Sequence, residues 1–148
     1  MTVKQMDHVG VVVDDLEAAV EFFAAIGLEE SGRGEVEGEL VDRIVALDGV
    51  HTQIVFMQVP DGAGRLELVR FLSPPAEGDS AGTPSDVLGL RHVSFAVDDI
   101  DAAVAAVRAL GVELIGELVN YKDFYRLCYV RGPAGIIVSL AEPLTEGG

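Results

Sequence analysis

The amino-acid sequence repeats itself at an offset of 84 residues, from His8 to His92, and this internal repeat constrains the fold more than any other feature. Residues 7–20 align with residues 91–104, and the match continues without a gap to residues 27–29 against 111–113. It brings a histidine, an Asp-Asp pair and a glycine into register, which shared composition alone would not easily do. We therefore predict two copies of one supersecondary unit.

Each copy opens with a short apolar strand that carries a histidine near its start. Period-two alternation places His8 and Gly10 on one face of the first strand, and His92 and Ser94 on the matching face of its counterpart. The bulkier residues of both strands point the other way. We expect a helix to cover the bulky face and the histidines to face a concave surface.

A helix is predicted after each of these strands. Asp14 and Asp98, each followed three residues later by an acid, are typical of capping boxes, and apolar residues then recur at helical spacing. Gly27 and Gly111 stand where each helix should end in a left-handed residue. Both copies are therefore predicted to begin with a strand, followed by a helix that ends at a glycine.

Three further strands are predicted after each helix. They span residues 29–35, 52–59 and 65–72 in the first copy, with a short helix or irregular segment at 40–47, and residues 113–118, 125–131 and 135–141 in the second. Residues 73–89 contain three prolines and are typical of a linker. The sequence thus predicts an α+β fold of two tandem βαβββ modules, 1–72 and 90–148, which together form one domain. Their curved half-sheets should surround a shared cleft.

Composition excludes several classes of partner. The 148 residues are 49% hydrophobic, and 25 acidic against 10 basic residues give a net charge of −15, which repels nucleic acid and anionic membranes. Cys128 is the only cysteine, so no intramolecular disulfide is possible, and its apolar surroundings predict a buried structural thiol. The chain begins without the pattern of a signal peptide and has no run of membrane-spanning length. We expect a cytoplasmic protein.

Three polar residues are placed by the repeat where a metal could bind. His8 and His92 occupy equivalent strand positions, and Glu67 lies within an apolar run, where an ionised carboxylate is costly unless a cation compensates it. Two imidazoles and one carboxylate suit a divalent ion such as Zn, Ni, Co, Mn or Fe. The third histidine, His51, follows a turn and has no counterpart in the repeat.

The chain resembles the vicinal oxygen chelate superfamily, which includes glyoxalase I, methylmalonyl-CoA epimerase, extradiol dioxygenases, and the fosfomycin and bleomycin resistance proteins. The resemblance spans nearly the whole chain and rests on four motifs: Asp7-His8-Val9-Gly10, Arg65-Leu66-Glu67-Leu68, Arg91-His92-Val93-Ser94 and Gly132-Pro133-Ala134-Gly135. It implies a glyoxalase-like domain and is far more specific for the fold than for the reaction.

In glyoxalase-like members a metal lies in the cleft, held by one residue from each of four strands. The resemblance implies His8, Glu67 and His92 as three of these ligands. The fourth is a glutamate in the family, but Ser139 stands at that place here, and Glu142, three residues on, should point to the opposite face. In glyoxalase I and the epimerase that glutamate is implied to move a proton, which a serine hydroxyl cannot do at neutral pH. Extradiol dioxygenases also use a carboxylate there.

Further residues are candidate substrate contacts around this set: Gln53, Tyr121, Tyr125, Arg126 and Ser139. The aromatic segment 120–125 is predicted either to form a lid over the cleft or to close the end of the barrel. Arg126 is predicted either to bind an anionic substrate group or to pair with a surface acid.

We predict from these features a metal-dependent lyase or isomerase that acts on a small oxygenated metabolite by enolate-type chemistry, with Glu67 as candidate base. A metal-free protein that sequesters a small molecule is the alternative from another class, and loss of the fourth ligand is compatible with it. A ferrous dioxygenase is the third hypothesis. The resemblance also implies a homodimer.

Overall fold

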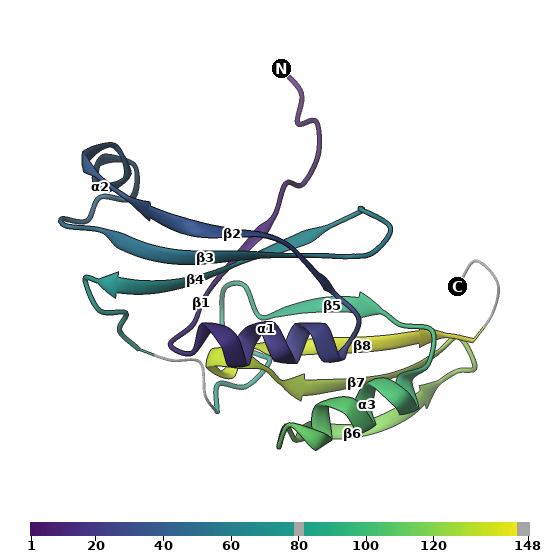
Figure 1. The fold of residues 1–148 in the computed structure, drawn as a ribbon. Helices are drawn as coiled ribbons and strands as arrows, with labels where there is room; N and C mark the ends of the chain where they lie inside the picture. The colour runs from purple at the N-terminus through teal and green to yellow at the C-terminus, as the bar shows by residue number, and fades with distance from the viewer. Residues whose placement is uncertain (79–81, 145–148) are drawn as a thin grey trace. The chain divides into compact units, whose positions relative to one another are not determined.

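The structure is a computed structural model that describes residues 1–78 and 82–144. Its contacts divide the chain into two compact units, unit 1 (Met1–Gly78) and unit 2 (Asp79–Gly148). Each unit contains, in chain order, a strand, a helix and three further strands, and unit 1 has one additional short helix (Figure 1). The predicted α+β fold of two tandem βαβββ modules is confirmed.

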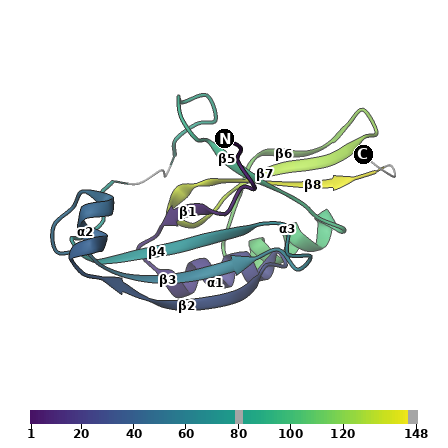
Figure 2. The same cartoon turned by 90° about the horizontal axis from the view of Figure 1, so that it is seen from above.

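Unit 1 forms a mixed four-stranded sheet. Its elements are β1 (Val9–Val12), α1 (Leu16–Ala25), β2 (Glu29–Glu37), α2 (Glu39–Val45), β3 (His51–Gln58) and β4 (Arg65–Ser73). The strand order is β1-β4-β3-β2, with β1 parallel to β4 and the other neighbours antiparallel. Figure 2 shows α2 at the end of the β2–β3 pair, where the sequence predicted a short helix or irregular segment.

Unit 2 repeats this topology without the extra helix. Its elements are β5 (His92–Ala96), α3 (Ile100–Ala109), β6 (Leu114–Tyr121), β7 (Tyr125–Arg131), a 3-10 turn (Pro133–Gly135) and β8 (Ile137–Pro143). The strand order is β5-β8-β7-β6. The last strand begins two residues later than predicted, because Ala134 and Gly135 adopt φ values of 54° and 75° that are incompatible with a strand.

The helix caps lie one residue beyond the predicted positions. Asp15 accepts the N–H of Ala18 at 3.0 Å and Asp99 accepts that of Ala102 at 3.0 Å, so these residues, and not Asp14 and Asp98, are the N-caps. The physical reason is that each first strand stays bonded to its sheet for one residue more, since the Val13 N–H donates to the carbonyl of Val69. The corresponding bond in unit 2 joins Val97 and Ala141.

The helices α1 and α3 each pack on one face of the sheet of their own unit, and the apolar core of each unit lies between the helix and that sheet. The helix residues of this core in unit 1 are Leu16, Ala19, Phe22 and Phe23, and the sheet residues include Val55, Met57, Leu66 and Leu68. In unit 2 the helix residues are Ile100, Ala103, Val104 and Val107, and the sheet residues include Cys128, Val130, Val138 and Leu140. The Cys128 thiol is free and buried, as predicted, and burial raises its pKa. Among the described residues, no helix is long and apolar enough to span a membrane.

Candidate metal and ligand site

The side chains of His8 and Glu67 face each other on one surface of the unit 1 sheet. Glu67 lies on β4 directly beside Gly10 of β1, and His8, two residues earlier, shares that face. His8 Nε2 lies 3.8 Å from Glu67 Oε2, and the two side chains are 35% and 26% exposed. This distance is too long for a hydrogen bond but suits two ligands that approach one ion.

Asp7 contacts the other ring nitrogen of His8, Nδ1. His8 Nδ1 lies 2.6 Å from Asp7 Oδ2, and Arg65 Nη2 donates to the same oxygen at 2.9 Å. These two contacts lower the pKa of Asp7 to about 2, so its carboxylate is charged at neutral pH. In a neutral imidazole whose Nδ1 donates to Asp7, the lone pair is on Nε2, the atom that faces Glu67.

An aromatic side chain supports this pair. The Phe56 ring meets the His8 ring edge-on, with centroids 5.8 Å apart and planes at 83°, and the Arg65 guanidinium lies 4.3 Å over the Phe56 ring. Phe56 lies on β3 beside Glu67. Sequence reasoning missed both Phe56 and the role of Asp7, because the cross-strand register that joins them to His8 is not visible in a linear apolar run.

Unit 2 repeats the strand pairing of this site with different side chains. Ser94 pairs with Ser139 in the β5–β8 register, as Gly10 pairs with Glu67, and the His92 and Tyr129 rings contact each other at 5.2 Å. Since Tyr129 also lies beside Ser139, it is the counterpart of Phe56. Ser139 is therefore the register counterpart of Glu67, and a buried hydroxyl stands in unit 2 where unit 1 has a carboxylate.

Glu142 does not replace the missing carboxylate. Its Oε1 accepts the backbone N–H of Ile100, the first residue of α3, at 3.1 Å. The side chain therefore lies on the helix-covered face, which is the orientation that the sequence predicted for it.

Gln53 and Arg126 also lie on the helix-covered faces of their sheets, so neither shares a face with the histidine of its unit. Arg126 donates to both carboxylate oxygens of Asp101 on α3, at 2.8 and 3.0 Å, which raises the pKa of Arg126 and lowers that of Asp101. Pairing with a surface acid was one of the two roles predicted for this arginine. Gln53 Nε2 lies 3.5 Å from Glu35 Oε1.

Tyr121 and Tyr125 face each other across the β6–β7 hairpin, on the surface that carries His92 and Tyr129. The turn between them is tight, with the Phe124 N–H donating to the carbonyl of Tyr121 at 3.0 Å. Both tyrosine side chains are exposed. The segment that the sequence offered as a lid is therefore a hairpin tip with exposed aromatic rings.

Within residues 1–78 and 82–144, no group of three or more His, Cys, Asp or Glu side chains gathers closely enough to hold a metal ion. The His8–Glu67 pair belongs to unit 1 and His92 belongs to unit 2. His51 begins β3, and its Nε2 lies 2.7 Å from Glu35 Oε2.

Comparison with known proteins assigns the family. A sequence model described as the Glyoxalase/Bleomycin resistance protein/Dioxygenase superfamily matches residues 7–129. The chain belongs to this superfamily. Among solved structures, a glyoxalase family protein from Bacillus cereus is 44% identical with a TM-score of 0.93, over 98% of this chain and 97% of that one.

Two further proteins and one further solved structure are similar to this chain at lower identity. The uncharacterized proteins YwbC of Bacillus subtilis and YaeR of Escherichia coli are each 29% identical, over 89% and 94% of this chain and 92% and 96% of their own lengths. A mutant fosfomycin resistance protein from Listeria monocytogenes, solved with Mn(II) and 1S,2S-dihydroxypropylphosphonic acid, has a TM-score of 0.61 at 17% identity. The alignment covers 94% of this chain and 90% of that one. At this identity the likeness concerns the fold alone.

Proposed function

We propose that this glyoxalase-superfamily chain is a metal-dependent lyase or isomerase acting on a small oxygenated metabolite by chelation and enolate-type chemistry. The observation that carries the proposal is the His8–Glu67 pair, with Nε2 and Oε2 3.8 Å apart and Nδ1 held by Asp7. In metal sites, the histidine nitrogen that does not bind the metal usually bonds to a carboxylate. This bond fixes the tautomer and raises the basicity of the nitrogen that binds the metal.

The donor types on the two histidine-bearing faces suit a divalent metal. His8, Glu67 and His92 would hold it, and their two imidazoles and one carboxylate suit Zn, Ni, Co, Mn or Fe. A bound ion of this kind would supply a Lewis acid that polarises a substrate carbonyl and stabilises an enolate. The Mn(II) in the Listeria fosfomycin resistance protein is compatible with such a role in this superfamily.

The side chains of the chain itself would bind the substrate and move the proton. Glu67 is partly exposed on the face it shares with His8. Its carboxylate would leave the metal transiently and accept a proton from a carbon beside a substrate carbonyl. Asp7 keeps the His8 ring oriented while this occurs. Ser139 is a neutral hydroxyl that can hydrogen-bond to a substrate oxygen but cannot act as the second base. Tyr121 and Tyr125 are candidate substrate contacts on the His92 face.

One observation favours a second candidate, a metal-free protein that sequesters a small molecule. Ser94 Oγ donates to Ser139 Oγ at 3.1 Å, and Ser139 is only 4% exposed. This neutral, satisfied pair occupies the place of a carboxylate and needs no cation to compensate it.

The test is elemental analysis of protein purified without a histidine tag, for the wild type, Glu67→Gln and Glu21→Gln. Glu21 is an exposed glutamate on α1 and serves as the matched control. We expect the wild type and Glu21→Gln to retain a stoichiometric divalent metal and Glu67→Gln to lose most of it. No retained metal in any variant would favour the sequestering protein, and equal retention by all three would mean that Glu67 is not a metal ligand. Retained iron with oxygen uptake would instead indicate a dioxygenase.

A further inference from the structure

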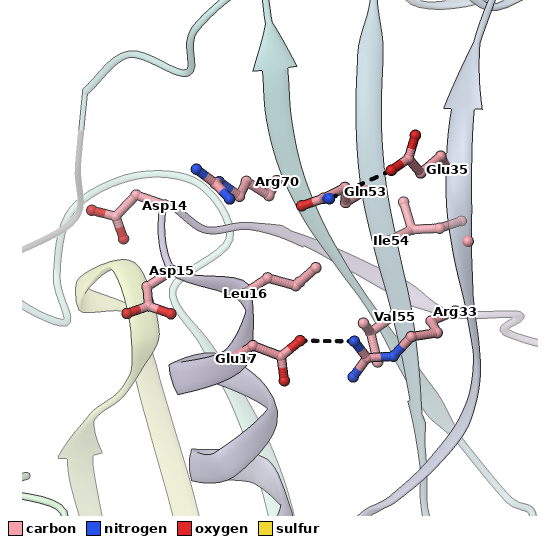
Figure 3. Close-up of a pocket in the computed structure, with 11 residues that line it drawn as sticks. Asp14, Asp15, Leu16, Glu17, Arg33, Glu35, Gln53, Ile54, Val55 and Arg70 are labelled. Carbon is pink, nitrogen blue, oxygen red and sulfur yellow. Dashed lines mark hydrogen bonds and ion pairs between the residues drawn. The ribbon is translucent and has the colours of Figure 1, made fainter.

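Unit 1 contains a cavity of about 460 Å³ on the sheet face opposite His8 and Glu67 (Figure 3). It lies between the first turn of α1 and strands β2, β3 and β4. The lining residues with charged or amide side chains are Asp14, Asp15, Glu17, Arg33, Glu35, Gln53 and Arg70. Leu16, Ile54 and Val55 add apolar surface. The volume suits a small organic ligand.

Most of the polar lining is already paired within the protein. Glu17 bonds to Arg33 at 2.7 Å and Gln53 to Glu35 at 3.5 Å, as the dashed lines in Figure 3 show. Asp15 caps α1. These contacts leave the carbonyl oxygen of the Gln53 amide available to a ligand.

Two charged groups of the lining remain unpaired. Within the part of the chain that the structure describes, neither the Arg70 guanidinium nor the Asp14 carboxylate has an ion-pair or hydrogen-bond partner. Figure 3 shows their side chains beside the first turn of α1. One free cation and one free anion therefore border the same cavity.

The internal repeat shows how the equivalent place is filled in unit 2. The bonds from Val13 to Val69 and from Val97 to Ala141 are equivalent, so the residues that follow, Arg70 and Glu142, are counterparts. Gln53 pairs with Arg70 as Arg126 pairs with Glu142, which makes Gln53 the counterpart of Arg126.

Unit 2 fills this place with one carboxylate and one guanidinium of its own. Glu142 accepts the N–H of Ile100 at the start of α3, and Arg126 binds Asp101 through two hydrogen bonds. The Arg126 guanidinium is also attracted by the carboxylates of Glu142 and Asp99, and both raise its pKa.

Unit 1 has different groups at these two positions. Arg70 replaces the carboxylate with a cation, which cannot accept the N–H at the start of the helix, and Gln53 replaces the guanidinium with a shorter neutral amide. Glu17, the counterpart of Asp101, is bonded to Arg33 instead. A ligand carboxylate would therefore restore the one partner that unit 1 lacks, and the free carboxylate that borders the same cavity would bind a cationic group of that ligand.

We propose that this cavity binds a small zwitterion of the α-amino acid class. Its carboxylate would bind Arg70 and the first turn of α1, where the helix dipole favours an anion. Its ammonium group would bind Asp14 and the Gln53 carbonyl oxygen. Four acids against two arginines in the lining disfavour phosphate and other polyanions. The site does not depend on the proposed metal chemistry, because it lies on the opposite face of the sheet.

The experiment is a titration of the full, ¹⁵N-labelled chain followed by amide chemical shifts. The probes are L-leucine and L-glutamine, with 4-methylpentanoate and isoamylamine as the two halves of leucine and inorganic phosphate as the anion control. The variants are Arg70→Gln, Arg70→Glu, which recreates the unit 2 carboxylate, and Arg43→Gln, an exposed arginine on α2 outside the cavity.

We expect at least one amino acid to give saturable shifts at the amides of Leu16, Gln53 and Arg70, in the wild type and in Arg43→Gln. Affinity should fall about tenfold or more in both Arg70 variants, because a charge-assisted pair is lost. The spectra also report whether each variant is folded. Three results would each overturn the proposal: no saturable shift with either amino acid, unchanged affinity in Arg70→Gln, or equally tight binding of phosphate or of one half of leucine.

Discussion

The hydroxyl of Ser94 lies 3.1 Å from the hydroxyl of Ser139, at the register position where Gly10 faces Glu67 in the other unit. The Ser94 hydroxyl donates to the Ser139 hydroxyl, so this position holds a neutral hydrogen-bonded pair. At this position of the repeat, unit 1 therefore has a candidate anionic ligand, Glu67, and unit 2 has a neutral pair of serines.

Ser139→Glu is expected to tighten divalent-metal binding, because it adds a fourth, charged ligand. The same carboxylate would be buried without compensation whenever the metal is absent, so the melting temperature of the apo-protein should fall while that of the holo-protein does not. Calorimetric metal titration and thermal melts of both forms measure these effects. Unchanged affinity together with equal melting of apo and holo forms would mean that position 139 never meets a metal.

Asp7→Asn is expected to weaken metal binding by about 10- to 100-fold, the usual effect of removing an outer partner of a histidine ligand. The amide still accepts a hydrogen bond from His8 Nδ1 but carries no charge to raise the basicity of Nε2. A competition titration against a chelator measures the change, with Asp48→Asn, an exposed acid elsewhere in unit 1, as control. Equal affinity of the two variants would remove Asp7 from the site.

His51→Gln is expected to remove a pH-dependent part of the stability. Glu35 and, more weakly, Glu37 raise the pKa of His51 above its ordinary value of 6.5. The His51–Glu35 pair therefore stabilises the fold fully below pH 6.5, as long as Glu35 is still ionised. This stabilisation is lost as the pH rises through the raised pKa of His51. The melting temperature of the wild type should exceed that of the variant most clearly below pH 6.5, and Glu35→Gln should behave like His51→Gln. A difference that stays constant with pH would contradict this.

A homodimer is expected in solution. The helix α2 buries none of its residues, and its Leu40 and Ile44 are 70% and 82% exposed. Exposed apolar groups of this size are typical of surfaces that associate. Sedimentation velocity at micromolar concentration tests the assembly, and a single monomeric species would contradict it.

The sequence by itself determined the two βαβββ modules, because hydrophobic periodicity and the glycines that stop both helices are local signals. It also indicated that His8 shares a strand face with Gly10, and His92 with Ser94, since alternation along a strand follows directly from backbone geometry. The buried Cys128 followed from the same kind of local pattern, whereas residues 40–47 were predicted only as a short helix or an irregular segment, and the structure has a helix at Glu39–Val45.

Only the tertiary structure decided which residues meet across strands. Asp7 with Arg65, His8 with Phe56 and Ser94 with Ser139 are brought together by the register between strands that are distant in sequence. Register also placed Gln53 and Arg126 on the helix-covered faces, where residue type alone had suggested contacts to a substrate. Alternation fixes the relative side of residues within a strand, but a shift of one residue between strands exchanges the faces of a whole partner strand. Such a choice depends on packing between the strands, which no single stretch of sequence contains.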